Sequence, residues 1–222
     1  MTTQTRIAIL LFEGFDVMDA AGPYEVLRWL PNAQVSFVAK QRGPVISEGH
    51  GVSLVADTAL AELPHPDVLV VPGGSGELPA RDDAQICDWL RGAANAGAFV
   101  ASVCTGALLL GAAGLLRGKR ATTYWMALDE LPKFGATPVR ERYVFDGKLV
   151  TSAGVSAGID MALALAAALR GKEVAQAIQL GIEYAPAPPF DTGSPSTAPA
   201  DMVARVRSLS RFAETPKPAR AS

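Results

Sequence analysis

The sequence predicts an α/β sandwich with a largely parallel central sheet. Three observations support this prediction. Short apolar runs alternate along the chain with longer stretches of helical pattern. Several of these runs are apolar throughout, which is typical of strands buried on both faces of a parallel sheet. The run 67–71 ends in Pro72-Gly73-Gly74, and the run 98–103 leads almost directly into a stretch rich in Ala and Leu.

The expected elements can be placed in order along the chain. Strands are expected at 7–12, 35–39, 52–55, 67–71, 98–103 and 120–123, followed by a hairpin of 143–146 and 149–151 around Asp146-Gly147. Helices are expected from about Gly22 to Leu30, and at 84–94, 105–116, 124–131, 155–170, 172–184 and 201–212. Residues 1–213 are expected to form one domain, and residues 214–222 a disordered tail.

Composition and charge exclude several classes of function. Of the 222 residues, 49% are hydrophobic and 19% are charged, and the net charge is −2. Because there is no basic block, neither a nucleic-acid partner nor an anionic membrane surface is expected. The two cysteines have no CxxC spacing, so neither a disulfide framework nor a cysteine-based metal site is expected. The sequence shows no signal-peptide pattern and no membrane-spanning apolar stretch, which predicts a cytoplasmic protein with no membrane partner.

Cys104 is the candidate reactive centre because it lies between a predicted strand and a predicted helix. A nucleophile at such a sharp turn is exposed at the sheet edge, beside unpaired backbone N–H groups and the positive end of the helix dipole. We therefore expect an exposed Cys104 whose thiolate form is favoured. The alternative is a buried structural cysteine, which is the role expected for Cys87.

Asp19, Gly73 and Gly74 are further candidates for the site. Asp19 lies just before the expected start of the first helix, where a carboxylate either caps the helix or serves the site. Two glycines after a buried strand allow a close approach of the backbone and can direct N–H groups into a site at the carboxyl end of the strand. Gly73 and Gly74 are therefore candidates for oxyanion or substrate binding, although most such pairs are only turns.

Six segments spread along the chain form a distinctive combination. They are DVMDAAGPYEVL at 16–27, VPGGSG at 71–76, SVCTGALLLGAAGLLRG at 102–118, RATTYW at 120–125, AGID at 157–160 and EYAPAPPFDTGSP at 183–195. The third segment resembles the ThiJ/PfpI superfamily, and all six together resemble its isonitrile hydratase branch. The resemblance runs from about Arg6 to Val206. It implies a flavodoxin-like three-layer sandwich with the cysteine at a nucleophile elbow.

The resemblance also implies an activity and a set of residues for it. The activity is that of a hydratase, a lyase that adds water to an isonitrile, R–N≡C, to give the N-substituted formamide. The family's nucleophile matches Cys104, its acidic residue near the first helix matches Asp19, and the residue after its cysteine matches Thr105. The family members are homodimers that use no metal or organic cofactor. The proline-rich stretch 185–199 is expected to be extended and to pack across the dimer interface.

These residue types suit the chemistry. A thiolate is a soft nucleophile for the soft isonitrile carbon, and its attack is expected to give a thioimidate on Cys104. Asp19 is expected to move protons and to activate water, and to titrate together with the thiol as a coupled pair. The Thr105 hydroxyl is expected to orient the substrate or water, and the backbone N–H groups of Gly74 and Thr105 to stabilise developing negative charge.

Some positions differ from related sequences. Tyr124 stands where relatives often carry His, and Ala185 stands where an acidic residue is expected. Thr105 replaces the His that follows the cysteine in PfpI peptidases. The only histidines, His50 and His65, lie in turn-like contexts, so no Cys–His–Glu triad is expected. These differences disfavour a peptidase or an amidotransferase.

Two other functions would use the same residues. A reactive Cys104 beside Asp19 is also expected in a redox-responsive, stress-protective protein. A related cysteine enzyme would act on carbonyls such as glyoxals. A transcription factor of the AraC type is disfavoured, because the sequence shows no helix-turn-helix module after the last expected helix and no basic patch.

Overall fold

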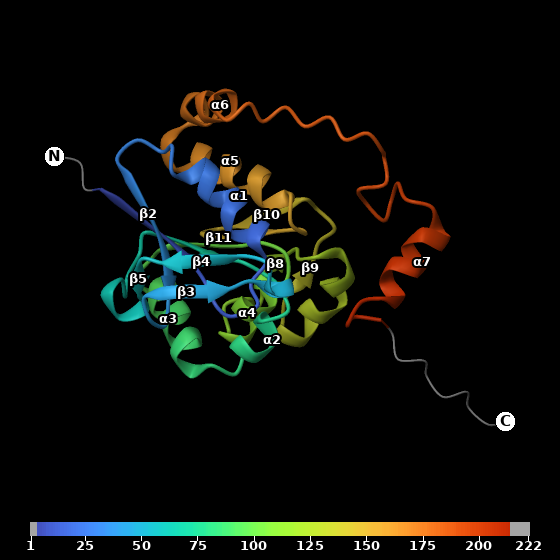
Figure 1. Cartoon of the computed structure of the whole chain (residues 1–222), viewed down its shortest axis with the longest axis horizontal. Helices are drawn as coiled ribbons and strands as arrows, with labels where there is room; N and C mark the ends of the chain where they lie inside the picture. The colour runs from blue at the N-terminus through green and yellow to red at the C-terminus, as the bar shows by residue number, and fades with distance from the viewer. Residues whose placement is uncertain (1–3, 214–222) are drawn as a thin grey trace.

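The computed structural model describes residues 4–213 and is built on a central sheet of seven strands, with helices on both of its faces (Figure 1). The order of the strands in the sheet is β10-β11-β7-β6-β1-β2-β5. Neighbouring strands are parallel except in the hairpin of β10 and β11. The strands are β1 (Thr5–Leu10), β2 (Ala33–Ala39), β5 (Thr58–Ala59), β6 (Val68–Val71), β7 (Phe99–Ser102), β10 (Tyr143–Asp146) and β11 (Leu149–Ser152). The predicted α/β class with a largely parallel sheet is confirmed.

Seven α-helices and three 3₁₀-helices accompany the sheet in the described part of the chain. The α-helices are α1 (Val17–Leu27), α2 (Glu77–Ala80), α3 (Ala84–Asn95), α4 (Gly106–Ala112), α5 (Ala157–Arg170), α6 (Lys172–Gly181) and α7 (Ala200–Ser208). The 3₁₀-helices are η1 (Glu48–His50), η2 (Leu60–Glu62) and η3 (Trp125–Phe134). Helices α1 and α5 cover one face of the sheet, and α3 and α4 cover the other (Figure 1). No helix within residues 4–213 is long and apolar enough to cross a membrane.

The register of the central strands brings their carboxyl ends together. Val71 at the end of β6 is paired with Ser102 at the end of β7, and Ser102 is also paired with Thr151 of β11. The strands β6 and β11 are buried along their whole length, and only Phe99 of β7 is partly exposed. Ligand sites in open parallel sheets lie at this edge, outside the carboxyl ends of the strands.

The first helix begins earlier than expected. We expected its start near Gly22, but α1 begins at Val17 because Asp16 caps it: the Asp16 carboxylate accepts hydrogen bonds from the backbone N–H groups of Met18 (2.9 Å) and Asp19 (3.3 Å). Pro23 therefore lies inside the helix rather than in its first turn. Asp19 consequently lies within the first turn of α1 and not before the helix.

The helix after Cys104 is shorter than expected. It ends at Ala112 instead of continuing to Leu116, and Gly114 follows with a left-handed φ of +80°. Gly111 in this helix packs directly against the Phe134 ring, since a Cβ at Gly111 would lie 2.5 Å from the ring. The helical stretch expected at 124–131 is η3, which ends at Phe134 and is followed by Gly135 with a φ of +75°.

Several smaller expectations were also wrong. The run 52–55 does not join the central sheet: β4 (Ser53–Ala56) pairs with β3 (Gly43–Ile46) in a separate two-stranded sheet. The run 120–123 contributes only β8 (Arg120–Ala121), which pairs with β9 (Thr137–Pro138). Helices α6 and α7 end three and four residues before the predicted ends, at Gly181 and Ser208. The tail predicted at 214–222 lies outside the described residues.

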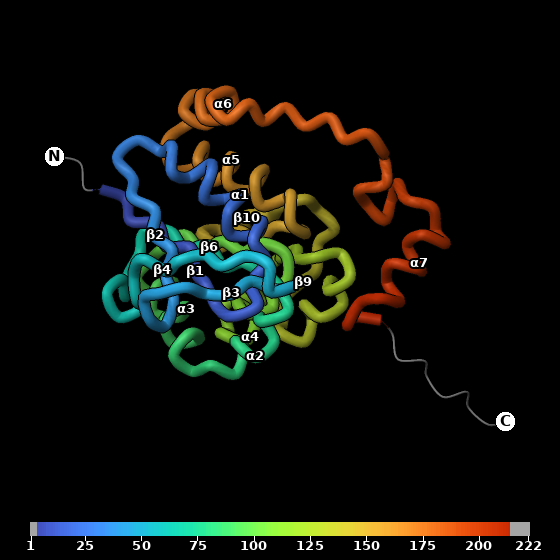
Figure 2. Tube along the Cα trace, viewed as in Figure 1, coloured from blue at the N-terminus to red at the C-terminus, as the bar shows by residue number. Residues whose placement is uncertain are grey.

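The chain between α6 and α7 has no regular secondary structure. It runs as an extended arc from α6 to α7, as predicted for the proline-rich stretch 185–199 (Figure 2). Its one phenylalanine, Phe190, is 76% exposed. The arc ends where α7 returns toward the side of the molecule that carries η3, so a C-terminal segment lies close to the carboxyl edge of the sheet.

Candidate active site

Cys104 lies between β7 and α4, consistent with the predicted nucleophile elbow. Its φ is +55°, in the left-handed region that non-glycine residues adopt rarely, so the backbone is strained at this residue. The surrounding loops hold this conformation on both sides. The Cys104 N–H donates to the carbonyl of Ala153 (3.1 Å), and the Cys104 carbonyl accepts from the Thr123 hydroxyl (2.6 Å).

The Cys104 side chain is more buried than expected. Only 7% of the residue is exposed. Burial, followed by the nearby Asp19 carboxylate, raises the pKa of the Cys104 thiol well above its usual value. The backbone N–H groups of Thr105 and Val155 donate to the sulfur and act in the opposite direction, but they are outweighed. The prediction of an exposed cysteine with a favoured thiolate was therefore wrong: the free thiol form is favoured.

Asp19 is the second ionisable group of the site and is fully buried. One carboxylate oxygen, Oδ2, accepts a hydrogen bond from the Gly73 N–H (2.8 Å), and the other, Oδ1, has no hydrogen-bond partner among the described residues. Burial, together with repulsion from the Asp16 and Glu48 carboxylates, raises the pKa of Asp19 to about 8, and the Gly73 and Cys104 contacts oppose this shift. The Asp19 carboxylate raises the pKa of the Cys104 thiol, while the contact with Cys104 lowers the pKa of Asp19. Each group thus shifts the pKa of the other, which agrees with the predicted coupled pair.

Thr105 and the two glycines connect Asp19 to Cys104. The Gly74 N–H donates to the Thr105 hydroxyl oxygen (3.2 Å), as the Gly73 N–H donates to Asp19. Both N–H groups of the glycine pair are thus used within the protein, where they hold the two side chains. Only glycine fits at these two positions without a steric clash. A Cβ at Gly73 would lie 2.7 Å from the Thr105 nitrogen and 2.9 Å from Asp19 Oδ2. A Cβ at Gly74 would lie 2.4 Å from the carbonyl oxygen of Gly14, and φ at Gly74 is +114°.

Cys104 opens into a cavity of about 610 Å³. The cavity is lined by residues from seven separate parts of the chain: Asp16, Glu48, Gly74, Ser75, Cys104, Thr105, Tyr124, Met126, Val155, Val206, Leu209, Ser210, Arg211 and Phe212. Tyr124, the residue that replaces the usual His, is among them, and its ring lies against Gly154, where a Cβ would be only 2.8 Å away. Ala185 is not among them. Neither are His50 and His65, and within residues 4–213 no cluster of His, Cys, Asp or Glu could hold a metal ion.

The sequence predictions did not include several of these residues. Val155 has a φ of +37° and supplies an N–H to the sulfur; its only signal in the sequence is its position just after a strand and Gly154. Glu48, Met126 and residues 206–212 come from segments with no motif of their own. They line the cavity because of the tertiary fold.

The raised pKa of Asp19 predicts a specific pH dependence of stability. Below about pH 4 the carboxyl group is protonated in both the folded and the unfolded state. Between pH 4 and about 8 only the unfolded state releases the proton, so Asp19 lowers the free energy of unfolding progressively, by an amount on the order of a few kcal/mol. Asn cannot ionise and escapes this loss of stability. The difference in Tm, Asp19→Asn minus wild type, is therefore expected to increase from pH 4 to pH 8.

Thermal unfolding followed by circular dichroism at several pH values measures this difference. Asp191→Asn, which changes an exposed aspartate in the proline-rich stretch, is the control and is expected to show a nearly constant difference. A difference for Asp19→Asn that does not change with pH contradicts the raised pKa.

Comparisons with known proteins place this chain in a family. The model of the DJ-1/PfpI family matches residues 5–168. The isonitrile hydratase of Pseudomonas putida is 50% identical over 202 residues, which are 91% of this chain and 88% of that protein. The HTH-type transcriptional regulator CdhR of Pseudomonas aeruginosa is 34% identical over 175 residues, but these are only 51% of its length. The crystal structure of a ThiJ/PfpI family protein from Pseudomonas syringae, 38% identical, superposes with a TM-score of 0.90 over 96% of this chain and 88% of that chain.

Proposed function

The chain belongs to the DJ-1/PfpI family, and we propose that within this family it is an isonitrile hydratase, an enzyme that adds water to an isonitrile to give an N-substituted formamide. The resemblance predicted from the sequence is thereby confirmed. One observation carries the assignment: the chain is 50% identical over most of its length to an isonitrile hydratase, and its buried Asp19 carboxyl group lies against Cys104, which lines the cavity. The substrate is a small molecule, in keeping with a cavity of about 610 Å³.

In the first step that we propose, the Cys104 sulfur attacks the terminal carbon of R–N≡C. The attack requires the thiolate, so the pair formed by Cys104 and Asp19 must first lose one proton. The proton that the pair retains is then delivered by Asp19 to the former isonitrile carbon. The product is a thioimidate, Cys104–S–CH=N–R, in which one S–C bond and one C–H bond have formed. Its mass exceeds that of the free protein by the mass of the whole isonitrile.

In the second step, water adds to the thioimidate carbon and the C–S bond breaks. Asp19, now ionised, takes a proton from the attacking water, and the nitrogen takes up from solvent a proton equivalent to the one that the pair released in the first step. The remaining hydroxyl proton passes to the leaving sulfur. Collapse of the tetrahedral carbon releases R–NH–CHO and returns the thiol. The atoms of one isonitrile and one water are thus accounted for, and no oxidant, reductant or metal is needed for the balance.

The remaining residues position this pair in the proposed mechanism. Thr105 and Val155 offer backbone N–H groups to the sulfur, which stabilise the thiolate as it forms in a buried place. The Thr105 hydroxyl is fixed by Gly74 and orients the substrate or water, while Gly73 orients Asp19. The two glycines therefore act by holding side chains rather than by binding the substrate directly.

A methyl group at Gly73 is expected to disturb both side chains. In Gly73→Ala the new Cβ displaces Thr105 and Asp19, and a misplacement of about 1 Å lowers kcat/KM by roughly 100-fold. Gly92→Ala is the matched control: it lies in α3 with open space around the added Cβ and is expected to keep activity and gain about 0.5–1 kcal/mol of stability. The effect of each added methyl group on kcat/KM is measured from formamide production by the two purified variants. Equal activity of Gly73→Ala and Gly92→Ala contradicts the positioning role.

The burial of Cys104 also bears on the redox alternative. Oxidation by peroxide follows thiolate character and solvent exposure, and Cys104 has a raised pKa and little exposure. A redox-responsive role is therefore less supported than hydration. The other alternative, an enzyme that acts on glyoxals, is tested below with methylglyoxal as the substrate.

Product analysis with a simple alkyl isonitrile tests the proposed function. The purified protein in ¹⁸O-labelled water is expected to convert it to the formamide carrying one labelled oxygen, and methylglyoxal in a parallel reaction is expected to be consumed no faster than without protein. If none of several alkyl and aryl isonitriles is converted to its formamide, the assignment is contradicted.

The proposal includes a homodimer in the cytoplasm. The exposed extended arc between α6 and α7, with Phe190 on it, supports a second copy packing along this stretch. Both cysteines are free thiols, as the reducing cytoplasm favours. A monomeric mass in solution at micromolar concentration contradicts the dimer, and fractionation of the source cells checks the location.

A further inference from the structure

The last described residues of the chain form one side of the Cys104 cavity. We call residues 206–212 the C-terminal wall; Val206, Leu209, Ser210, Arg211 and Phe212 in it line the cavity. This segment is about 100 residues away from Cys104 in the sequence and lies outside the part matched by the family model. The wall therefore adds to this cavity a boundary from beyond the residues that the family model matches.

Specific contacts hold the C-terminal wall in place. Arg211 forms an ion pair with Glu77 of α2, a carboxylate that is fully buried and also accepts two hydrogen bonds from Arg81 (2.6 and 2.8 Å). A buried carboxylate is costly without its partners, so Glu77 favours the docked position of the wall. Two further contacts involve the ends of this segment. The guanidinium of Arg207 lies over the Trp125 ring, 5.0 Å from its centroid, and Phe212 packs against the core.

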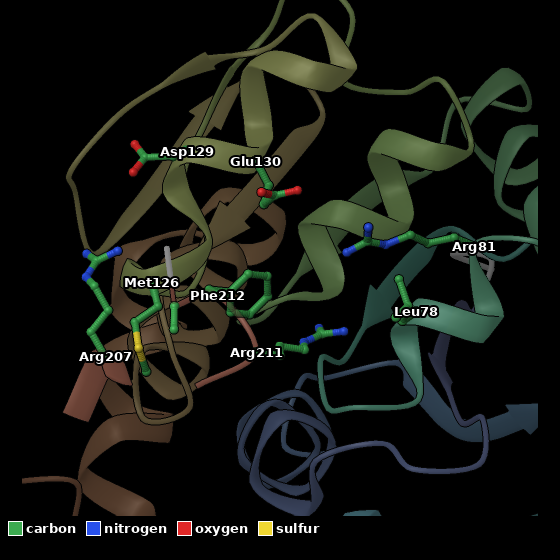
Figure 3. Close-up of a pocket in the computed structure, with 9 residues that line it drawn as sticks. Leu78, Arg81, Met126, Asp129, Glu130, Arg207, Arg211 and Phe212 are labelled. Atoms are coloured by element: carbon green, nitrogen blue, oxygen red, sulfur yellow. The ribbon is translucent and has the colours of Figure 1, made fainter. Parts of the chain in front are cut away.

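A second cavity, of about 410 Å³, adjoins the first (Figure 3). It is lined by Leu78, Arg81, Met126, Asp129, Glu130, Arg207, Arg211, Phe212 and Ala213. Met126, Arg211 and Phe212 line both cavities, so they form the partition between them. Figure 3 shows Met126 and Phe212 projecting between Arg207 on one side and Arg81 on the other. The guanidinium of Arg211 is paired with Glu77 and lies 4.6 Å from the centroid of the Phe212 ring. The Met126 and Phe212 side chains form the apolar part of the partition.

We propose that Phe212 determines which isonitriles this enzyme accepts, because its ring closes the end of the Cys104 cavity and limits the length of the substituent R. This inference rests on the proposed function. The isonitrile group itself is small and uncharged, so R must supply most of the binding energy. The side chains of Val155, Val206, Leu209, Met126 and Phe212 offer apolar surface to it. The favoured substrates are therefore isonitriles with an uncharged apolar R, and removal of the Phe212 ring joins the two cavities into space for a longer one.

Kinetics with two linear isonitriles test the inference. We compare n-butyl and n-octyl isonitrile and take the ratio of kcat/KM for the longer to that for the shorter. Phe212→Ala is expected to raise this ratio about tenfold or more, as several added methylenes gain a place to bind, and Phe212→Trp is expected to lower it. Phe190→Ala, in the exposed arc, is the matched control and is expected to leave the ratio unchanged. An unchanged ratio in both Phe212 variants, with melting temperatures near that of the wild type, overturns the inference.

A second readout does not depend on turnover. N-butyl- and N-octylmaleimide label thiols, and the labelling rate of the Cys104 peptide is measured by mass spectrometry for each variant. Phe212→Ala is expected to accelerate the octyl reagent more than the butyl reagent, whereas equal acceleration of both overturns the role of Phe212 in setting the length. If the wild type hydrates no isonitrile but this selective labelling is found, the proposed function fails and the length limit stands. If isonitriles are hydrated and the Phe212 variants change neither the octyl-to-butyl ratio of kcat/KM nor that of the labelling rates, the inference about Phe212 fails and the function stands.

Discussion

Replacing Cys104 with serine is expected to lower formamide production by about four orders of magnitude or more, to near the rate without enzyme. Serine keeps the size and the polar character of the side chain, and the strained turn at this residue can still form. Its hydroxyl, however, is far less acidic than a thiol and is a harder nucleophile, so it attacks the soft isonitrile carbon poorly. Since we assign the covalent bond to the sulfur, no other described residue of the cavity replaces it.

Cys87→Ser is the matched control for this experiment. Cys87 is the other cysteine of the chain, is buried in α3 and does not line the Cys104 cavity. Its thiol donates to the Arg81 carbonyl (3.4 Å), a contact that a serine hydroxyl can also make. Initial rates of formamide production are measured with both variants, and their folds are compared by circular dichroism. Substantial turnover by folded Cys104→Ser contradicts the assigned nucleophile.

Replacing Asp19 with asparagine is expected to lower kcat by about 10²–10⁴-fold, the usual contribution of a general acid or base. Asparagine can still accept the hydrogen bond from Gly73, so the local geometry is largely kept. It cannot move a proton to the isonitrile carbon or take one from water. Both proposed steps are therefore slowed.

The same variant is expected to change the pH profile. In the wild type the coupled pair must lose one proton before attack, and the pKa of Asp19 is raised to about 8, so kcat/KM is expected to rise with pH through about 8. In Asp19→Asn the thiol must ionise alone, and burial still raises its pKa, so the rising limb is expected at higher pH. Rates from pH 5 to 10 measure this. Full turnover by Asp19→Asn with an unchanged profile contradicts the proton-shuttle role, and Asp191→Asn again serves as the control.

The parts of the fold that could be predicted are those set by local pattern. Fully apolar runs identified β1, β6 and β7, and the Asp146-Gly147 turn identified the hairpin of β10 and β11. The start of α1 was misplaced at about Gly22 because a proline in the first turn of a helix is common, so Pro23 favoured a start just before it; the Asp16 cap instead sets the start at Val17. The separate pair of β3 and β4 could not be predicted, because sequence patterning does not show which strands join the central sheet.

The candidate site was predictable in its residues but not in its environment. Cys104, Thr105, Asp19 and the pair Gly73-Gly74 do lie together, because β6 and β7 are neighbours and both end at the edge where α1 begins. The burial of the thiol was missed, since it arises partly from Tyr124, Met126 and the C-terminal wall, which are distant in the sequence. The predicted direction of the Cys104 pKa shift was wrong because burial of the thiol, followed by the nearby Asp19 carboxylate, outweighs the backbone N–H groups beside the sulfur.

The mass of the Cys104 peptide after reaction with an isonitrile tests the covalent mechanism most directly. The wild type and Asp19→Asn are mixed with n-butyl isonitrile, quenched after increasing times, digested and analysed together with the formamide in the same samples. The mechanism predicts an added mass equal to that of one isonitrile on the Cys104 peptide, transient in the wild type, forming before the formamide, and longer-lived in Asp19→Asn. Formamide that accumulates while the Cys104 peptide stays unmodified at every time in both proteins contradicts it.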